Sequence, residues 1–346
     1  MGNDRIDTRR VGVTTSSKTK VGVIGVGRLG TVHAKMYHEL DSAELVGAYD
    51  IDPSRCDPVA KELGVHVFPT LDELLANVEA VSIATPTVTH YAIASSTIER
   101  GLHAFIEKPI TSTVDEVQKL IRAADARKVK VQVGHIERFN PALLALEKYH
   151  LAPMFVECHR LAQFNPRGTD VAVVLDLMIH DIDIILSLVQ SPVEKVDASG
   201  VAVVSDSVDI ANARIEFANG CVANVTASRI SQRKMRKMRL FQRDAYISID
   251  FSEGLAEVFR LVDDTDPAAD KTMLLGEIGE GKYKRKIVFE QPEVKEVNAL
   301  KVELDSFLRS IRDDREPVVT ARDGLRALQV ADEILQKIKN QSIRVS

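Results

Sequence analysis

The sequence predicts an α/β protein with two domains: an N-terminal domain with a parallel, doubly wound sheet and a C-terminal α+β domain with a large, mostly antiparallel open sheet. From residue 20 to residue 134, short apolar runs alternate with helical patterns at the spacing of βαβ units. From residue 155 onward, longer strand patterns follow one another, and Asn219-Gly220 is typical of a two-residue hairpin turn. A chain of 346 residues is long enough to bury two cores.

The composition is that of an ordinary globular protein, with 45% hydrophobic and 27% charged residues. A formal net charge of -5 gives no general reason to expect binding to nucleic acid or to a membrane, and no apolar run reaches the length of a membrane span. The three cysteines form neither a metal-binding nor a disulfide pattern, which favours a cytoplasmic protein without a metal. Residues 1–19 are polar and lack the apolar core of a signal peptide, so we expect a flexible tail.

The first domain, residues 20–136, begins with a short apolar strand and a glycine turn. Gly25, Gly27 and Gly30 form the pattern G-x-G-x-x-G at the start of a helix. These glycines permit a tight turn, the approach of a pyrophosphate and close packing of helix on strand, and the helix N-terminus offers N–H groups to phosphates. In this context the pattern predicts a dinucleotide-binding Rossmann domain rather than the glycine-rich turn of an unrelated α/β protein.

Asp50 ends the second strand, 20 residues after Gly30. A carboxylate at this place accepts hydrogen bonds from the adenosine ribose and repels a 2′-phosphate, so we expect NAD as the cofactor. Arg55 is the nearby cation that would favour NADP. The alternative for Asp50 is a solvated acid without a ligand.

The rest of the first domain continues the alternation. We expect strands at 65–68, 80–84, 104–106 and 129–133, and helices at 53–63, 71–76, 87–100 and 114–127. The later strands end at Thr85-Pro86, Glu107-Lys108-Pro109 and Gly134-His135. Ligands bind beyond the carboxyl ends of parallel strands, so these residues should share one rim with the glycine turn. The expected cofactor contacts are Gly25, Gly27, Arg28, Leu29, Gly30, Asp50, Thr85, Pro86, His90, Glu107 and Lys108.

Lys108 is a candidate for chemistry as well as for cofactor binding. A lysine at the end of a buried strand can be partly desolvated, which lowers its pKa and suits it to hydrogen-bond a substrate hydroxyl. The alternative is an ordinary surface lysine in a βα loop.

The second domain, residues 137–346, is expected to bind substrate and to form oligomers. Strand patterns cover 156–161, 193–204, 210–217, 221–228, 238–250 and 257–262, and the polar segment 263–282 is expected to be a mobile loop. Helices are expected at about 170–189, 299–312 and 322–339, and the last of these could pack back on the first domain.

The helix expected at 170–189 carries a polar stripe on an otherwise apolar surface. Asp176, His180, Asp183 and Ser187 follow one another at spacings of four, three and four, which places them on one face of an α-helix. A carboxylate one turn from an imidazole can orient it and raise its basicity, so His180 is a candidate general base. The alternatives are a structural pair on a solvent-facing stripe and a metal site, for which a third ligand is missing.

Three blocks of the sequence resemble the Gfo/Idh/MocA family of nicotinamide-dependent sugar oxidoreductases. They are Glu107-Lys108-Pro109, the run from His135 to Pro141, and Asp176-x-x-x-His180. The resemblance extends from about residue 20 to the last helix. It implies hydride transfer between a sugar carbon and nicotinamide, with Lys108, Asp176 and His180 as catalytic residues. His180, alone or with Lys108, would handle the hydroxyl proton, and Asp176 would position His180 or Lys108. It also implies a C-terminal sheet that packs against its mate in a homodimer or homotetramer.

Residues 134–141 and 176–183 are similar to the branch of this family that oxidises C3 of UDP-N-acetylglucosamine. In that branch the 3-keto product goes to a PLP aminotransferase, giving an amino sugar for lipid A. The alternatives are another sugar, inositol or deoxysugar oxidoreductase of the family, and a nicotinamide-binding sensor without chemistry.

The diphosphate of a UDP-sugar calls for cations in the second domain. Arg229 and the basic run 233–239 are candidates, although such a run can also protect a sheet edge. The expected substrate contacts are His135, Arg138, Asn140, Arg160, Arg167, Asp176 and His180.

Overall fold

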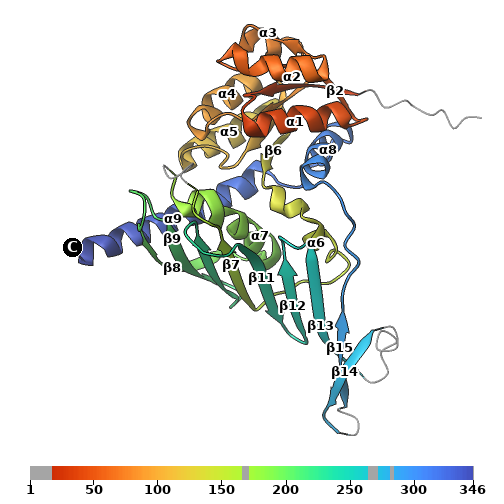
Figure 1. The fold of residues 1–346 in the computed structure, drawn as a ribbon, viewed down its shortest axis with the longest axis vertical. Coiled ribbons are helices and arrows are strands. Elements are labelled where there is room, and N and C mark those ends of the chain that lie inside the picture. Colours follow the sequence, from red (N-terminus) through yellow and green to blue (C-terminus); the bar gives the residue numbers. More distant parts are fainter. Residues whose placement is uncertain (1–17, 166–170, 264–271, 281–283, 346) are drawn as a thin grey trace, which may run out of the picture.

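The computed structural model describes residues 18–165, 171–263, 272–280 and 284–345. A six-stranded sheet lies at one end of the molecule and a nine-stranded sheet at the other (Figure 1). Among the residues described, no helix has the length and apolar character needed to cross a bilayer.

The first sheet is parallel throughout, with strand order β3-β2-β1-β4-β5-β6, which confirms the predicted Rossmann domain. Its strands are β1 (Thr19–Ile24), β2 (Ala43–Tyr49), β3 (His66–Val67), β4 (Ala80–Ile83), β5 (His103–Glu107) and β6 (Val131–Gly134). The connecting elements are α1 (Arg28–Glu39), η1 (Pro53–Arg55), α2 (Cys56–Leu63), α3 (Leu71–Leu75), α4 (Thr87–Glu99) and α5 (Val114–Arg127). β4 is buried along its whole length, as expected for a strand covered by helices on both faces.

The sequence predicts both C-terminal helices in the second domain, with the last one able to pack back on the first domain. The first of these helices covers the Rossmann sheet instead, and the last one contacts both domains as expected. Phe307 of α8 (Ala299–Arg312) shares a core cluster with Tyr37 of α1, so α8 covers the first sheet. α9 (Ala321–Val345) contributes to both cores: Leu328 packs in the first domain and Ile334 in the second. Amphipathic periodicity identifies a helix but does not say which sheet its apolar face covers.

The second sheet has the order β14-β15-β13-β12-β11-β7-β10-β9-β8. The pair β7–β10 is parallel and its other neighbouring pairs are antiparallel, which confirms the predicted mostly antiparallel sheet. The remaining elements of the domain are η2 (Ile136–Phe139), α6 (Pro141–Leu144), η3 (Val174–Met178) and α7 (Ile179–Val189). Its strands are β7 (Phe155–Leu161), β8 (Val193–Val201), β9 (Ile210–Phe217), β10 (Val222–Ser228), β11 (Met235–Gln242), β12 (Ala245–Asp250), β13 (Leu255–Asp263), β14 (Met273–Ile278) and β15 (Arg285–Glu290).

Two details of this sheet differ from the sequence prediction. The single strand expected at 238–250 is a hairpin, because Asp244 has a positive φ of 62° and turns the chain between β11 and β12. The segment 263–282, expected to be a loop, contains β14, and the prediction also missed β15. Both are strands of six residues, and β14 is the edge strand of the sheet; the pattern of so short a strand is hard to separate from that of a loop.

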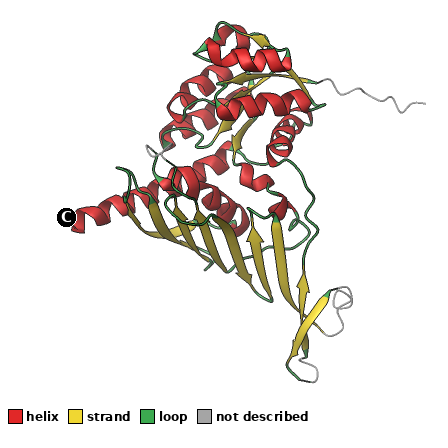
Figure 2. Ribbon diagram, in the orientation of Figure 1, coloured by secondary structure: helices red, strands yellow, loops and turns green. Residues whose placement is uncertain are grey.

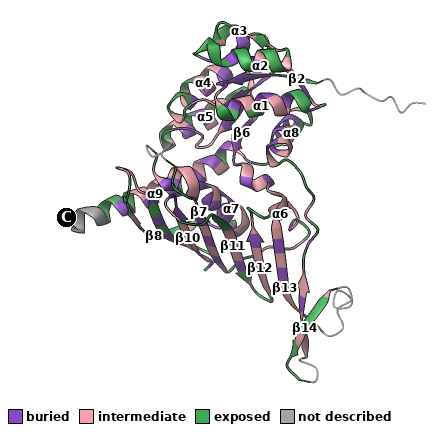
Figure 3. Cartoon of the chain, viewed as in Figure 1, coloured by how far each residue is buried: buried purple, intermediate pink, exposed green. Residues whose placement is uncertain are grey.

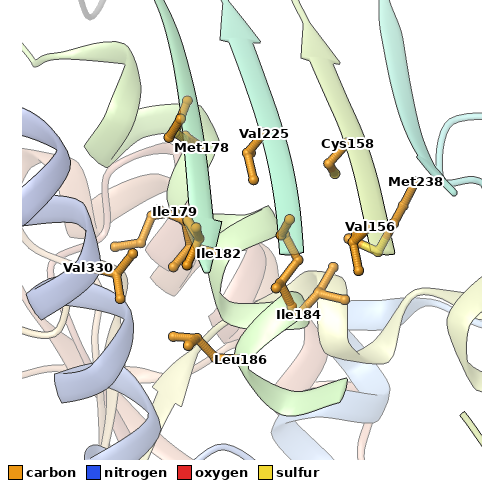
Figure 4. Close-up of a cluster of buried hydrophobic side chains, with 14 of the residues drawn as sticks. Val156, Cys158, Met178, Ile179, Ile182, Ile184, Leu186, Val225, Met238 and Val330 are labelled. Atoms are coloured by element: carbon orange, nitrogen blue, oxygen red, sulfur yellow. The ribbon is translucent and has the colours of Figure 1, made fainter. Parts of the chain in front are cut away.

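Helices α7 and α9 cover one face of the second sheet, and the opposite face is open (Figure 2). Residues along β7 alternate between buried and half-buried, as this arrangement requires (Figure 3). Buried side chains from β7, β10, β11, α7 and α9 meet in one core, including Cys158, Ile182 and Val330 (Figure 4). This core fixes α7 on the sheet and thereby places its first turns against the Rossmann domain.

Candidate functional site

A cavity of about 860 Å³ lies at the carboxyl ends of β1, β2 and β4, where the sequence predicts the cofactor. The glycine turn forms one wall. A Cβ atom on Gly30 would lie 1.7 Å from the carbonyl oxygen of Gly25, whereas a Cβ on Gly27 would meet nothing within 4 Å. Gly30 therefore allows the helix to approach the turn, and Gly27 leaves open space beside the helix N-terminus. These residues fit a dinucleotide whose pyrophosphate lies on the turn.

The carboxylate of Asp50 is tied into the same wall. Its Oδ2 accepts a hydrogen bond from the Val26 N–H at 2.9 Å, and its Oδ1 accepts one from the Asp52 N–H at 3.0 Å. A carboxylate has lone pairs beyond these two, so ribose binding by Asp50 stays a prediction that the geometry allows. Arg55 also lines the cavity, with its Nε 3.4 Å from Asp52 Oδ2.

Thr85 and Pro86 line this cavity, but His90 does not. The His90 ring is buried, with Nδ1 3.0 Å from the carbonyl oxygen of Pro109 and Nε2 2.8 Å from that of Thr85. His90 therefore links the loop after β4 to the loop after β5. This corrects its assignment as a cofactor contact, because the sequence did not show that the side chain points into the domain.

Glu107 lies at the end of β5 and holds the loop that carries Lys108. Its Oε1 is 3.0 Å from Nε2 of the buried His33, and its Oε2 accepts a hydrogen bond from the Lys108 N–H at 3.2 Å. Burial raises the pKa of Glu107, but His33 and Lys108 outweigh burial and hold it below the usual range. An ionised Glu107 is therefore a fixed anchor beneath the lysine, and its contact with the cofactor stays a prediction.

Lys108 crosses from the first domain to the second. Its Nζ donates a hydrogen bond to the backbone oxygen of Asp176 at 2.7 Å and lies 3.6 Å from Asp176 Oδ1. The side chain is 17% exposed. Burial lowers the pKa of Lys108, and the charges of Asp176 and Glu107 oppose that shift without cancelling it. A lysine with a lowered pKa is suited to exchange a proton with a substrate hydroxyl.

The polar stripe predicted on one regular helix is interrupted. Residues 174–178 form a π-helical turn, η3, before α7 begins. Such wide turns change the angle between successive side chains and occur often at functional sites. Among the described residues, Asp176 contacts Lys108, one of its two expected partners, and no hydrogen bond joins it to His180, the other. Asp183 is buried and binds Arg138, while Ser187 is half-buried and donates to the Ile184 oxygen of its own helix, so the stripe does not form one solvent face.

His180 lies beyond the π-helical turn, and the residue as a whole is half-buried. Its Nδ1 atom is buried and has no hydrogen-bond partner within the described part of the chain. Burial holds the pKa of His180 well below its usual range, and the positive charges of Lys108 and Arg160 add to the effect. The imidazole is thus neutral at neutral pH, the state that a general base requires.

His135 packs against His180 at the boundary between the domains. The two rings are perpendicular, with centroids 6.5 Å apart. His135 is buried, and burial lowers its pKa as well. Its direct contact with a substrate stays a prediction, and its ring lies edge-to-face with that of His180.

Two arginines expected to bind substrate are committed to buried ion pairs. Arg160 is 3% exposed and donates to both carboxylate oxygens of Asp181, at 2.8 and 2.7 Å, and to Glu137 Oε1 at 2.7 Å. Arg138 binds both oxygens of Asp183, at 2.6 and 2.9 Å. Both predictions are corrected, because the guanidinium groups hold α7 against β7 and η2. Glu137 and Asp181 were the missed partners, and the alternation of acids along 181–183 was the available signal.

Asn140 makes hydrogen bonds within the protein. Its Oδ1 accepts a hydrogen bond from the Ala142 N–H at 3.1 Å and caps α6, while its Nδ2 donates to Glu137 Oε2 at 3.0 Å.

Arg167, also expected to contact the substrate, lies outside the described residues. Within the described ranges, no group of three or more histidine, cysteine, aspartate or glutamate side chains is placed to hold a metal ion.

The same two domains occur in known proteins. Residues 19–135 match the Gfo/Idh/MocA oxidoreductase family with an NAD-binding Rossmann fold, and residues 154–256 match the C-terminal domain of Gfo/Idh/MocA proteins. A UDP-N-acetylglucosamine 3-dehydrogenase from Acidithiobacillus ferrooxidans is 37% identical over 91% of this chain and 96% of that protein. An inositol 2-dehydrogenase from Rhizobium meliloti is 26% identical over 92% of this chain and 96% of that protein.

A solved structure of the UDP-N-acetylglucosamine 3-dehydrogenase from Acidithiobacillus ferrooxidans has the same architecture. It superposes with a TM-score of 0.83 at 35% sequence identity, over 94% of this chain and 99% of that chain. The similarity therefore covers both domains and the boundary between them, where Lys108 meets Asp176.

Proposed function

The chain belongs to the Gfo/Idh/MocA family of oxidoreductases, and from this premise we propose that it oxidises the C3 hydroxyl of UDP-N-acetylglucosamine with NAD. The observation that carries the proposal is the meeting of Lys108 and the π-helical turn at the edge of the cofactor rim. It brings a lysine with a lowered pKa and a neutral histidine to the same boundary. NAD, when bound, supplies the acceptor for the hydride.

The roles of the residues follow from their environments. His180 takes the proton of the sugar hydroxyl, because its ring is neutral and so has a nitrogen that can accept a proton. Lys108 donates a hydrogen bond to the oxygen as negative charge develops there. Asp176 holds the lysine through its backbone oxygen and its carboxylate. Asp176 is therefore a positioning residue for Lys108 rather than for His180.

The test is formation of NADH with a panel of substrates, followed by fluorescence. UDP-N-acetylglucosamine should be oxidised efficiently, and N-acetylglucosamine and myo-inositol poorly. Oxidation of myo-inositol without oxidation of any UDP-sugar would replace this function by that of an inositol dehydrogenase. No reduction of NAD by any of these compounds would favour a nicotinamide-binding sensor.

The open face of the second sheet supports the proposal of a homodimer or homotetramer. Aromatic side chains of neighbouring strands contact one another in a row on this face, with ring centroids 5.0–5.8 Å apart: Phe155, Phe241, Tyr246, Phe259 and Phe289. A continuous apolar row on a half-exposed surface is typical of a protein interface. Replacing Phe241 by Glu should lower the mass measured by light scattering; an unchanged mass would place the interface elsewhere.

The product of the proposed reaction indicates which kind of enzyme acts next. A 3-keto sugar is a substrate for transamination, so we propose a PLP aminotransferase as the next enzyme and the cytoplasm as the place of both. Coupled conversion of UDP-N-acetylglucosamine to a 3-amino sugar by the two enzymes would support this assignment.

A further inference from the structure

One arginine of the second domain faces the catalytic boundary but is not buried there. Arg236 of β11 lies directly opposite Arg160 of β7 in the antiparallel register. Opposed residues of paired strands project to the same face of a sheet. Arg236 is therefore on the face covered by α7, yet its side chain is 52% exposed where that of Arg160 is 3% exposed.

Arg236 is also held less tightly by carboxylates than Arg160 is. Arg160 donates to Glu137 Oε1 at 2.7 Å, whereas Arg236 Nη1 lies 3.6 Å from that oxygen. A separation of 3.6 Å is too long for a hydrogen bond. Glu137 thus holds Arg236 near the cluster without saturating its donors, of which a guanidinium has five.

The loop before β11 is fixed at this rim. The Ser231 N–H donates to the Ala162 oxygen at 2.9 Å, and Gln163 Nε2 donates to the Gln232 oxygen at 3.0 Å. These bonds tie the chain entering β11 to the end of β7. The backbone at Arg236 is therefore fixed beside β7 by strand pairing, and Glu137 is the acid that its side chain approaches.

Arg236 is also within electrostatic reach of the proposed base. Its positive charge is one of those that lower the pKa of His180, together with Lys108, Arg160 and His135. Glu137 belongs to η2, which begins directly after His135, the residue whose ring packs against His180. An anion bound by Arg236 would consequently lie beside the substrate rather than at a remote surface.

The neighbouring cations of the basic run point elsewhere. Met238 and Leu240 are buried beneath the helices, so Arg236 shares their face, and Lys237 and Arg239 belong to the open face. There Lys237 pairs with Asp250 at 3.1 Å, and Arg239 pairs with Glu157 at 3.0 Å. Along β11, the alternation of side chains therefore places Arg236 on one face and Lys237 and Arg239 on the other.

We propose that Arg236 binds a phosphate of the substrate and so selects a nucleotide diphosphate sugar over an uncharged sugar or inositol. The planar guanidinium matches two phosphate oxygens, which gives orientation as well as attraction. This inference rests on the proposed function and identifies the residue that would make the substrate class specific.

The experiment compares Arg236→Gln with Lys237→Gln, which removes one positive charge from the adjacent residue on the opposite face. For Arg236→Gln we expect the KM for UDP-N-acetylglucosamine and the inhibition constant of UDP to rise about tenfold to a hundredfold, as for loss of a charged hydrogen bond. The values of kcat and the KM for NAD should stay within a few-fold. Lys237→Gln should leave all of these constants unchanged, and Arg236→Lys should recover part of the affinity for UDP.

The outcomes separate this inference from the proposed function. If the unaltered protein oxidises the UDP-sugar and Arg236→Gln matches Lys237→Gln in both constants, the inference is wrong and the function stands. A fall in kcat with unchanged KM and unchanged inhibition by UDP would also overturn it, because Arg236 would then act on His180 alone. Failure of the unaltered protein to oxidise or bind any UDP-sugar would overturn the function, and the inference with it.

Discussion

The cofactor cavity and the boundary around Lys108 are built from different chemical groups. The cavity is shaped mainly by backbone within the turn from Gly25 to Gly30, where absence of side chains makes room for a ligand. The boundary depends on side chains far apart in sequence, such as Lys108 and Asp176, which are 68 residues apart. A local pattern can form the first region, whereas the second requires two domains to pack correctly. Changes in the two regions should therefore separate cofactor binding from proton transfer.

The largest expected effect is the loss of turnover when Lys108, at the boundary between the domains, is replaced. Lys108→Ala removes the amine that would stabilise the developing charge, and turnover should fall by about 100- to 10,000-fold while affinity for NAD is kept. Steady-state rates and titration of NAD by protein fluorescence measure the two quantities. Lys119→Ala, which removes an exposed lysine paired with Asp115, is the matched control. Normal turnover in both Lys108→Ala and His180→Ala would contradict the proposed mechanism.

A second experiment compares two glycines of the turn. In Gly30→Ala the new methyl group overlaps the Gly25 oxygen at 1.7 Å, so the free energy of unfolding should fall by about 1–3 kcal/mol or more. In Gly27→Ala nothing lies within 4 Å of the new atom, so stability should hold and only affinity for NAD should fall. Urea unfolding and NAD titration test both variants. Equal losses of stability would show that the turn is not shaped as described.

The difference between a cavity built from local backbone and a boundary built from distant side chains explains which features could be predicted from the sequence. The glycine turn, Asp50 and the strand ends were predictable, because each depends on a few neighbouring residues and on the rule that ligands bind at the carboxyl ends of parallel strands. The fold of both domains followed from the change in periodicity after residue 134.

The contacts of the second domain were less predictable. From the sequence, Arg160 is a cation on a strand, whether it binds substrate or forms an ion pair. Only the tertiary packing shows that Asp181 and Glu137 neutralise its charge. Asp176 and His180 are four residues apart, and a π-helical turn, which leaves no clear mark in sequence, turns them to different partners. Helical spacing therefore gives candidates for a site but does not give their pairings.

A third experiment tests the Asp50 side chain, which lines the cofactor cavity. Asp50→Ala removes the acceptor of the Val26 N–H and the charge that would oppose a 2′-phosphate. Affinity for NAD should fall by about tenfold, as for loss of one or two hydrogen bonds, and the preference for NAD over NADP should narrow. Asp50→Asn, which keeps one acceptor oxygen, should lose less affinity. A preference for NADP in the unaltered protein would contradict the role assigned to Asp50.

The last experiment concerns the two histidines of the boundary and measures a slope with pH. Burial lowers the pKa of His180 and of His135 in the folded protein, so between these lowered values and the usual 6.5 the unfolded chain binds more protons. Their contribution to stability is complete above pH 6.5 and is lost as the pH falls, with a slope of at most about 1.4 kcal/mol per pH unit for each histidine.

This pH dependence must be measured as a difference, because other buried groups titrate as well. Burial raises the pKa of Glu303, so the folded protein holds that proton and the contribution of Glu303 to stability weakens as the pH rises. We expect urea unfolding between about pH 5 and 7 to show a smaller loss of stability on acidification in the double variant His135→Asn, His180→Asn than in the unaltered protein. Parallel curves would mean that the two rings are not held neutral by the packing of the domains. The boundary would then be open to water, and His180 would be an ordinary exposed base rather than one tuned by burial.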